Sequence, residues 1–376
     1  MNGNKEAIMT RRELNRAIFK GTADKVLWQP RLEEWINTNR AKNQLPAPYR
    51  DMDDWEIYDY LRCSRRYAGR AGLVQSLNRA GLVVIEERHP SHRVITYRTP
   101  VGEITTRYHD LWEGDRLANE RIEDFPVKTA KDLRVAIDLV NRQQFRADVK
   151  AFEAADRAFG QRGEPTLFLT SSGFTELVKD WCGLLGTYYL LNDEAAVVEE
   201  YLEACERRDN RCIDAALQLP CRIFNFGDHA TNEFTPPPIL KKYLIPRWQR
   251  LAARLHKEGR YCHTHWDGHS KLMLPYLRDA QLDAVEALTP EPMGDMTLDE
   301  IKAAVGDEII CLDLLPAICF LPNYRTSDLV NYAKRVIDMF APRLILGISD
   351  EISSVGEIEK VAAVTEVVEK VCGLAE

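Results

Sequence analysis

Short apolar runs alternate with amphipathic stretches of helical length over the last two-thirds of the chain. From Pro165 onward, β-type runs are separated by segments whose apolar residues recur with helical spacing. The strands predicted by these runs are 166–170, 221–226, 260–265, 282–287, 309–312, 317–320 and 343–348. Strands that alternate with helices of about 8 to 20 residues are typical of parallel βαβ units.

An eighth strand is predicted at 26–28, before an exit loop that begins at Gln29. With that strand the pattern favours the α/β class and a single (β/α)8 TIM barrel as one domain over residues 1–376. A doubly wound open sheet is the alternative. The chain has no GxGxxG or Walker A sequence to support a nucleotide-binding version of it.

The first 160 residues carry a different, insertion-rich pattern. A helix is expected over 11–20, ended by Gly21, and Asp53 is expected to cap a helix over 54–61. Three extended stretches at 82–86, 94–99 and 102–106 are separated by proline and glycine turns. They predict a small antiparallel β meander, inserted at residues 80–108. Two further helices are predicted later in the chain, at 194–206 and 210–217.

Composition narrows the classes of protein to consider. Hydrophobic residues make up 45% and charged residues 29% of 376, which is ordinary for a globular protein. The net charge of −8 disfavours nucleic-acid binding. No apolar run approaches the ~20 residues that span a bilayer. Without an apolar signal-peptide core near Met1, and with nine cysteines but no CxxC pair, we expect a cytoplasmic protein with reduced thiols.

Polar and aromatic residues follow or end several predicted strands. In a parallel barrel the active site lies at the C-terminal ends of the strands, so these side chains are candidates for binding a substrate. They are Trp28, Arg31, Tyr261, Trp266 and His269. Arg31 is suited to a bidentate grip on a carboxylate or phosphate, and an ion pair with Glu33 or Glu34 is its alternative role. Packing in the core is the alternative for the aromatic residues.

His263 and His265 are candidates for metal ligands. Side chains two positions apart lie on one face of a strand, so both imidazoles are expected to point into the barrel mouth. With Glu286 from the next strand end they would form a zinc site. The alternative is a hydrogen-bonded histidine network that positions Asp267. Cys262 falls on the opposite face and is expected in the core.

Three aspartates that follow strand ends are candidates for acid–base chemistry: Asp228, Asp267 and Asp350. A carboxylate at such a position can bind a cation, anchor a substrate or move a proton. For Asp267 the alternative is a turn closed by Gly268, and for Asp350 it is a cap or dipole partner of the last helix.

Several motifs resemble the uroporphyrinogen decarboxylase superfamily, most strongly over about residues 220–365. They are His263-Thr-His-Trp-Asp-Gly-His269 with Leu274-Pro275, Asp283-Ala-Val-Glu-Ala-Leu-Thr-Pro290, Gly294-Asp295 with Leu298, Leu344-Ile-Leu-Gly-Ile-Ser-Asp350, and the opening Gly21-Thr-Ala-Asp24 with Val26 and Trp28-Gln-Pro30. The superfamily has a single (β/α)8 barrel, and it also contains zinc- and corrinoid-dependent methyltransferases.

The resemblance is closer to the methyltransferase branch. Decarboxylases carry an Arg-Gln-Ala-Gly-Arg-Tyr run after the first strand, where this chain reads Gln29-Pro-Arg-Leu-Glu-Glu34. The methyltransferases hold zinc with a His-x-Cys pair and a later cysteine. Here the pair is His263 and His265, and the last strand end offers Gly347, Ser349 and Asp350.

The resemblance therefore implies a metal-assisted methyltransferase. It would move a methyl group between a methoxyl, methylthiol or methylamine substrate and a corrinoid on a separate protein, with zinc at the barrel mouth. The alternative is a cofactor-free decarboxylase of a porphyrinogen, in which Arg31 holds a carboxylate and Asp228 or Asp267 stabilises a protonated pyrrole-like intermediate. A non-catalytic binding barrel is a third reading, and the sequence leaves a homodimer open.

Overall fold

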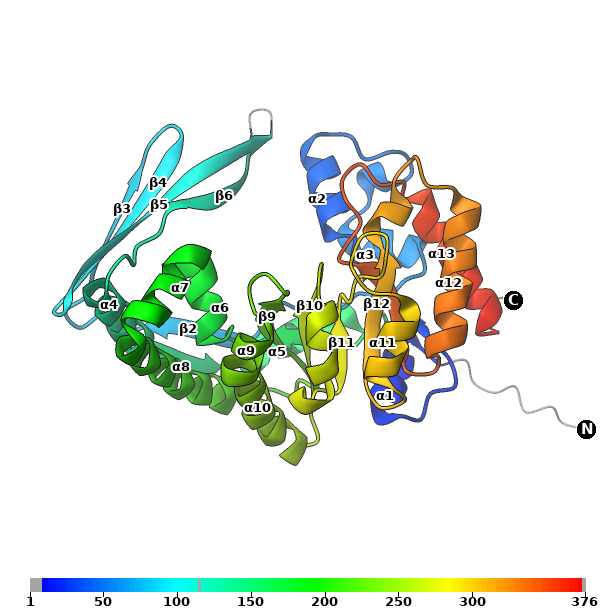
Figure 1. Cartoon of the computed structure of the whole chain (residues 1–376). Helices are drawn as coiled ribbons and strands as arrows, with labels where there is room; N and C mark the ends of the chain where they lie inside the picture. The colour runs from blue at the N-terminus through cyan, green and yellow to red at the C-terminus, as the bar shows by residue number, and fades with distance from the viewer. Residues whose placement is uncertain (1–8, 114–115, 374–376) are drawn as a thin grey trace, which may run out of the picture. The chain divides into compact units, whose positions relative to one another are not determined.

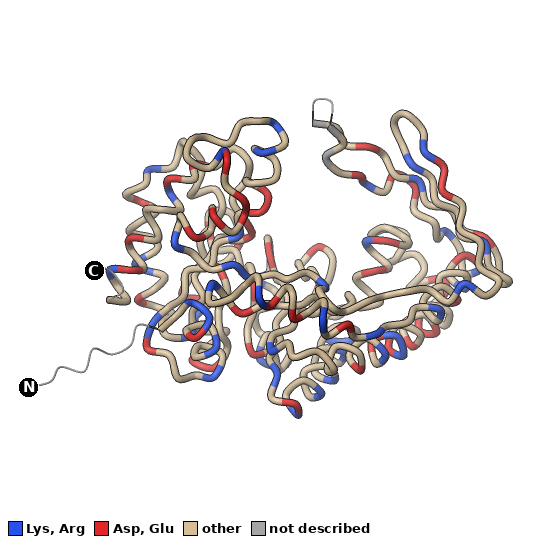
Figure 2. The backbone as a smooth tube through the Cα atoms, turned by 180° about the vertical axis from the view of Figure 1, so that it is seen from behind, with Lys and Arg blue, Asp and Glu red and all other residues tan. Residues whose placement is uncertain are grey.

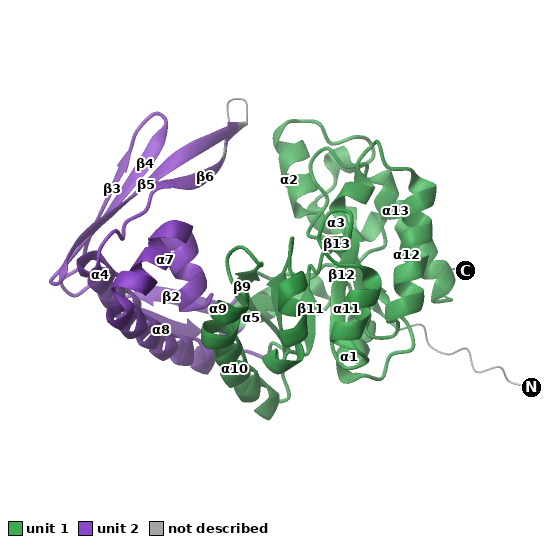
Figure 3. Ribbon diagram, viewed as in Figure 1, with its two compact units in different colours: residues 1–71, 150–168, 221–376 green, residues 72–149, 169–220 purple. Residues whose placement is uncertain are grey.

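The computed structural model describes residues 9–113 and 116–373, which form two compact units (Figure 3). Unit 1 comprises Met1–Ala71, Lys150–Phe168 and Cys221–Glu376, and unit 2 comprises Gly72–Val149 and Leu169–Pro220. The organisation of the whole chain as one barrel domain stays a prediction. Acidic and basic residues are interspersed along both units (Figure 2). Among the described residues, no helix is long and apolar enough to cross a membrane.

Unit 1 is built on a sheet of seven parallel strands in the order β1-β13-β12-β11-β10-β9-β8. The bounds are β1 (Leu27–Trp28), β8 (Thr166–Phe168), β9 (Ile223–Ala230), β10 (Tyr261–Trp266), β11 (Ala284–Glu286), β12 (Ile310–Pro316) and β13 (Leu344–Ser349). From β8 to β13 each strand pairs with the next strand along the chain, as the predicted βαβ alternation requires, and β13 also pairs with β1. The α/β class and the parallel sheet are therefore confirmed.

Helices pack on this sheet (Figure 1): α10 on β10, α12 on β12 and β13, and α1 and α13 on β1. The helices of unit 1 are α1 (Arg11–Lys20), α2 (Glu33–Ala41), α3 (Asp54–Tyr60), α5 (Val149–Phe159, from Lys150 on), α9 (Pro237–Ile239), α10 (Ile245–Lys257), α11 (Leu298–Val305), α12 (Thr326–Phe340) and α13 (Glu359–Val371). Shorter or irregular turns are η1 (Tyr49–Asp51), η3 (Leu240–Leu244), η4 (Lys271–Tyr276), η5 (Arg278–Ala280) and η6 (Ala317–Phe320). The predicted α1 and the Asp53 cap of α3 are confirmed.

An apolar cluster fills the N-terminal end of the sheet. Residues at the starts of the strands contribute Leu27, Ile223, Ala284, Ile310 and Ile345, and α1 covers them with Leu14, Ile18 and Phe19. A capping box at Thr10 and a left-handed Gly21 fix the two ends of α1. Since one end of the sheet is closed by hydrocarbon, polar chemistry is left to the other end, where the strands finish.

Residues 64–69 lie between the two edge strands of the sheet. The Ser64 N–H donates to the Trp28 carbonyl of β1 over 2.9 Å. On the other side the Thr166 N–H of β8 donates to the Arg66 carbonyl over 3.0 Å, and the Ala68 N–H donates to the Thr166 carbonyl over 3.0 Å. This segment is thus bonded through its backbone to both edges of the sheet.

Unit 2 holds two antiparallel sheets. One pairs β2 (Leu73–Leu77) with β7 (Gln143–Ala147), and the other has the order β3-β4-β5-β6 over Val83–Arg88, His92–Thr99, Gly102–Glu113 and Arg116–Asp124. Its helices are α4 (Ala130–Asn141), α6 (Gly173–Glu176), α7 (Gly183–Asp193) and α8 (Ala195–Ala216), with the π turn η2 (Leu177–Trp181). The second sheet is larger than the meander predicted at 80–108, because β5 is longer than expected and β6 adds a strand.

Two predicted elements are wrong. Instead of separate helices at 194–206 and 210–217, α8 runs without a break, because the charges at the expected gap are paired inside unit 2. Arg208 is fully buried there, with its guanidinium 2.9 Å from Asp209 and hydrogen-bonded to Glu176. The stretch predicted as a strand at 317–320 is the 3-10 turn η6, which follows Pro316 at the end of β12.

Candidate functional site

Polar side chains meet at the C-terminal ends of five neighbouring strands of unit 1. Parallel strands bring their ends to one edge, and the pairing places His265 of β10 opposite Glu286 of β11. We refer to the following residues as the strand-end cluster: Asn225, His229, His263, His265, Asp267, Glu286, Asp313 and Asp350. This is the end of a parallel sheet at which barrel enzymes carry their active sites.

A bulge in β9 aligns His229 with His265. Along β9 the chain advances four residues from Asn225 to His229, while β10 advances only two from His263 to His265. Gly227 lies inside the bulge with a φ of 69°, a conformation that glycine adopts without steric cost. As a result the two imidazole rings stack, with centroids 5.0 Å apart and an interplanar angle of 28°.

Arg66 lies between two buried carboxylates. Its guanidinium donates to Glu286 Oε1 over 2.7 Å and to Asp313 Oδ1 over 2.6 Å, while its Nε donates to Gln29 Oε1 over 2.9 Å. Burial raises the pKa of Asp313 to about 6, although Arg66 opposes the shift. For Glu286 burial is outweighed by Arg66 and the two histidines, which hold its pKa well below the usual range.

The second oxygen of Glu286 faces both predicted metal-ligating histidines. Oε2 accepts hydrogen bonds from the Asn225 amide over 2.8 Å and from the Tyr67 hydroxyl. His263 Nδ1 lies 3.4 Å and His265 Nδ1 3.7 Å from the same oxygen. The two imidazoles thus turn toward one carboxylate.

His263 is buried, and its burial lowers its pKa, which favours the neutral ring. Its Nε2 has no hydrogen-bond partner among the described residues. In the described part of the chain there are groups of three potential metal-binding side chains whose ligand atoms lie within 4.8 Å of one another. His263 belongs to none of these groups. The metal role of His263, His265 and Glu286 together stays a prediction.

His265 is the residue shared by the charged groups of the cluster. Its Nε2 lies 3.7 Å from Asp267 Oδ2 and 3.9 Å from Asp350 Oδ2. Burial opposes a charge on the ring, but the carboxylates of Asp267, Glu286 and Asp350 raise its pKa to about 10. Burial would raise the pKa of Asp267, and its histidine neighbours, His229 first, lower it strongly instead.

Arg31 pairs across the sheet rather than along its own loop. Its guanidinium bonds Asp350, lies 3.4 Å from Glu351 and comes within 3.9 Å of Glu286. The alternative role given for Arg31, an ion pair with Glu33 or Glu34, is therefore wrong, since its carboxylate partners are Asp350, Glu351 and Glu286. The guanidinium also lies over the Tyr67 ring at 5.6 Å, and its role in binding a substrate stays a prediction.

Several other candidates lie away from the cluster. Asp228 is buried and accepts from Arg247 over 2.9 Å and from the Trp248 indole over 2.7 Å, as a structural anchor of α10 would. Tyr261 packs on Phe19 at the N-terminal end of the sheet, with ring centroids 5.2 Å apart.

Three further candidates are not among the contacts of His265. Trp28 and Trp266 are buried in the core. His269 is exposed and pairs with Glu233 over 2.9 Å. The roles of these side chains in a reaction stay predictions.

Five residues that meet here were not predicted from the sequence: Arg66, Tyr67, Asn225, His229 and Asp313. Asn225 and Asp313 were readable in principle, because each is a single polar residue inside an apolar strand run, and a buried polar group needs partners. Arg66 and Tyr67 end the run Cys63-Ser-Arg-Arg-Tyr67 on the irregular segment 64–69. No apolar pattern marks that segment as part of the sheet.

Two groups in the cluster have the donor chemistry of a divalent metal site: His229, His265 and Asp267, and His265, Glu286 and Asp350. The first offers two imidazoles and one carboxylate, a set that suits zinc with an open position for water or substrate. In the second, arginine side chains already bind both carboxylates. The first group therefore fits a metal ion better.

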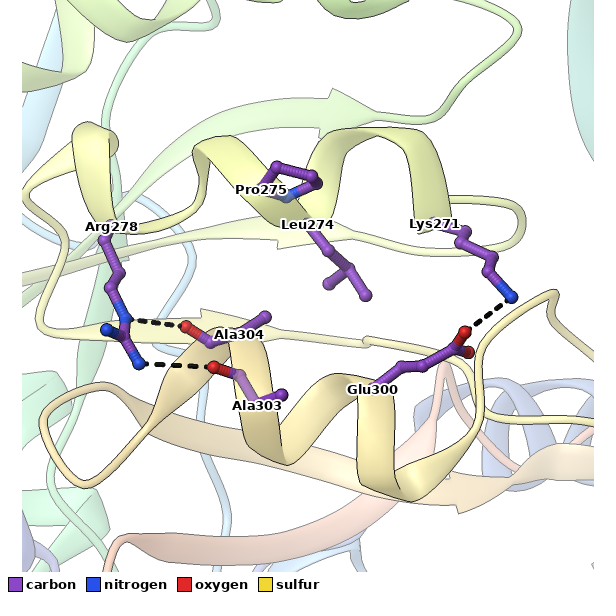
Figure 4. Close-up of a pocket in the computed structure, with 7 residues that line it drawn as sticks. All are labelled: Lys271, Leu274, Pro275, Arg278, Glu300, Ala303 and Ala304. Atoms are coloured by element: carbon purple, nitrogen blue, oxygen red, sulfur yellow. Dashed lines mark hydrogen bonds and ion pairs between the residues drawn. The ribbon is translucent and has the colours of Figure 1, made fainter.

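A separate cavity of about 460 Å³ lies between η4 and α11 (Figure 4). Lys271 at its rim pairs with Glu300 over 2.7 Å, and Arg278 donates to the carbonyls of Ala303 and Ala304. Lys271 and Glu300 thus pair with each other, and Arg278 donates hydrogen bonds to carbonyls at the end of α11. The cavity includes no residue of the strand-end cluster.

No family model matches the chain, and no curated protein matches it. A solved methyltransferase from Methanosarcina mazei is similar in structure with a TM-score of 0.60 at 12% identity, covering 97% of this chain and 99% of the other. A B12-independent methionine synthase from Shewanella sp. W3-18-1 has a TM-score of 0.39 at 7% identity, covering 85% and 87%. At these identities the first likeness shows the fold, which extends over nearly the whole of both chains.

Proposed function

We propose that this chain is a methyltransferase that moves a methyl group between a small methylated substrate and a corrinoid carried by a partner protein. The observation that carries the proposal is the convergence of His265, Glu286 and Asp350 where neighbouring parallel strands end. The activity itself is proposed by analogy with the Methanosarcina mazei methyltransferase that shares the fold.

The proposal includes a complete (β/α)8 barrel in unit 1. Residues 64–69 take the eighth strand position, since their backbone bonds both β1 and β8. Closure in this way explains why Arg66 and Tyr67 reach the strand-end cluster although they lie outside the seven regular strands. The proposed setting is the cytoplasm, because all nine cysteines are free thiols.

The side chains of the cluster would hold and orient the reacting groups. Glu286, charged and fixed by Arg66, turns toward His265 Nδ1 and so directs Nε2 toward Asp267 and Asp350. A metal ion held in the strand-end cluster through His265 would supply Lewis acidity, which would make the demethylated heteroatom a better leaving group. In transfer to the corrinoid, the bond between the methyl carbon and its heteroatom would break with the electron pair on the heteroatom, and the reduced corrinoid of the partner protein would supply the pair for the new bond to carbon.

Methyl transfer can be tested with purified full-length chain and free cob(I)alamin in place of the partner protein. Methanol, methanethiol and methylamines are offered in turn, and the absorption spectrum reports conversion to methylcob(III)alamin. We expect turnover with one substrate class, reduced at least about 100-fold in His265→Ala. Elemental analysis of both proteins is expected to find about one zinc per chain in the unmodified protein only.

Two other outcomes would reject the proposal. Absence of methyl transfer from every substrate class, together with loss of carbon dioxide from a porphyrinogen in metal-free buffer, would replace the proposal with a decarboxylase. Tight binding of a ligand without turnover of any kind would indicate a non-catalytic barrel.

A further inference from the structure

We propose that His229, His265 and Asp267 are the ligands of a zinc-type divalent metal ion in unit 1. This inference rests on the proposed function in assigning the ion to that reaction, and it changes the ligand set expected from the sequence. The ligand set predicted from the sequence is His263, His265 and Glu286. In the set proposed now, His229 from β9 and Asp267 after β10 replace His263 and Glu286.

The backbone brings these three side chains together. The bulge at Gly227 moves His229 level with His265, and Asp267 follows two residues later on the same strand end. His229 Nε2 lies 2.8 Å from Asp267 Oδ1, and His265 Nε2 lies 3.7 Å from Asp267 Oδ2. One ligand atom from each residue lies within 4.8 Å of the other two, as ligands of a single small ion do.

Asp267 also keeps an unused acceptor atom. Its Oδ1 is buried, yet among the described residues it makes no hydrogen bond, because the close His229 nitrogen does not approach it in hydrogen-bond geometry. A buried carboxylate oxygen without a donor is costly, and a metal ion would satisfy it. The His229 side chain is 39% exposed, which leaves the site open to a further ligand.

Glu286 is better suited to orient the site than to bind the ion. Arg66, Asn225 and Tyr67 already donate to its two oxygens. Its Oε2 lies 3.7 Å from His265 Nδ1, so it holds the ring through the nitrogen that does not face Asp267. A carboxylate behind a metal-bound imidazole is a common arrangement in zinc sites.

Asp350 is excluded as a primary ligand by its partner. The Arg31 guanidinium bonds Asp350 and lies 3.9 Å from Glu286, so its positive charge occupies the space beside both carboxylates. A cation held by His265, Glu286 and Asp350 would be repelled at short range. In the group that includes His229, the charged partners close to Asp267 are the imidazoles of His229 and His265 rather than a guanidinium.

A metal titration separates the two ligand sets. Chelator-treated full-length protein is titrated with Zn²⁺ against a chromophoric chelator, as the unmodified chain and as three variants. We expect His229→Gln and Asp267→Asn to weaken Zn²⁺ binding at least about 100-fold, and His263→Gln to change it less than about 3-fold. Circular dichroism of each variant checks that it is folded.

A gain of signal tests the same assignment without relying on lost binding. His229→Cys should still bind Co²⁺ and add a thiolate-to-cobalt absorption band in the near ultraviolet that the unmodified protein lacks. Failure of this band in folded protein, or a loss of Zn²⁺ binding in His263→Gln as large as in His229→Gln, would overturn the assignment. So would a lack of Zn²⁺ binding by the unmodified chain.

The two proposals fail separately. Methyl transfer by a protein whose Zn²⁺ binding ignores His229 and Asp267 would leave the function standing and reject this ligand set. Zinc bound through His229, His265 and Asp267 in a chain that transfers no methyl group would leave the site standing and reject the function.

Discussion

Arg66 is a single positive charge placed between the carboxylates of Glu286 and Asp313, and all three groups are buried. Burying an ion costs several kcal/mol unless partners compensate it, so each member of this trio depends on the other two. Burial raises the pKa of Asp313 although Arg66 opposes the shift, whereas Arg66 and the two histidines together hold the pKa of Glu286 below its usual range against burial. The charge on Glu286 is therefore fixed by a residue that lies outside the regular strands.

Removal of Arg66 should cost more stability than removal of any exposed arginine. We expect Arg66→Met to lower the free energy of unfolding by roughly 3–5 kcal/mol, because two carboxylates are left buried without a cation. Urea denaturation measures the change. Arg62→Met is the matched control, since the exposed pair of Arg62 with Glu369 contributes about 0–1 kcal/mol. Equal losses in the two variants would contradict the buried-charge argument.

A pH effect is expected from His256, away from the cluster. Its Nε2 lies 2.9 Å from Asp283, whose hydrogen bond raises the pKa of His256 above the ordinary value, and Cys262 Sγ lies 4.0 Å away. A raised pKa in the folded state gives stability that is complete below the unfolded pKa and is lost as pH rises through the folded pKa.

The measurement compares the unmodified protein with His256→Gln by urea denaturation at about pH 5.5 and about pH 8.5. The unmodified protein should exceed the variant by more at the lower pH. A difference that is the same at both values would show that protonated His256 does not stabilise the fold.

The bulge in β9 is the element that assembles the site. In regular register His265 would lie opposite Gly227, whereas the bulge puts it opposite His229. Gly227 allows this path with a φ of 69°. An alanine there would strain the bulge and move His229 relative to its neighbours.

Gly227→Ala should therefore affect both stability and the site. We expect a loss of about 1 kcal/mol in unfolding free energy from the positive φ, together with weaker Zn²⁺ binding. Gly259→Ala is the matched control, because Gly259 has a φ of 64° and nothing within 4 Å of an added Cβ. It should show the loss of stability alone. Unchanged Zn²⁺ affinity in folded Gly227→Ala would show that the bulge does not set the site.

Much of the sheet was predictable from sequence, because a strand between two helices must read as a short apolar run. The predicted starts and ends of β10 and β13 are close to those observed, and His265 and Glu286 were placed on facing strand ends. The start of β12 was predicted closely, but the strand continues to Pro316, beyond the predicted end at residue 312. These positions follow from counting residues along a regular period. A regular pattern of apolar residues does not predict an inserted residue or an irregular strand.

The remainder of the site depends on such irregularities. His229 becomes a partner of His265 only through extra residues in β9, which leave no trace in the polar pattern. Arg66 reaches Glu286 from residues 64–69, whose bonds are to backbone atoms distant in sequence. The full length of β5 was missed because its buried positions after Ile104 include the polar residues Thr106 and Asp110, so the buried face does not show as apolar alternation. The added strand β6 was missed because most of its residues are charged.

On the scale of the whole molecule, the apolar residues that stabilise unit 1 and the polar residues of the candidate site lie at opposite ends of the strands. Hydrocarbon closes the N-terminal end under α1, and the charged cluster occupies the C-terminal end. Unit 2 has its own apolar clusters around α4 and α8. A ligand of the cluster should therefore stabilise unit 1 first.

Metal removal tests this expectation. An ion that binds the folded state alone adds about 2.7 kcal/mol to the unfolding free energy when its free concentration is 100 times Kd. Hydrogen exchange with Zn²⁺ and with chelator should show the largest change in β9 and β10, and His229→Gln should show none. A change confined to β3–β6 would place the metal outside the cluster.

Residues 64–69 contribute to unit 1 in two ways, through their backbone and through two side chains. Main-chain amides and carbonyls, which every amino acid except proline provides in full, bond this stretch to the sheet independently of its side chains. Two adjacent positions on it, Arg66 and Tyr67, decide how the acid at position 286 is held. A substitution at either position would therefore change the charge or the hydrogen bonding of Glu286 while the backbone bonds of residues 64–69 remain.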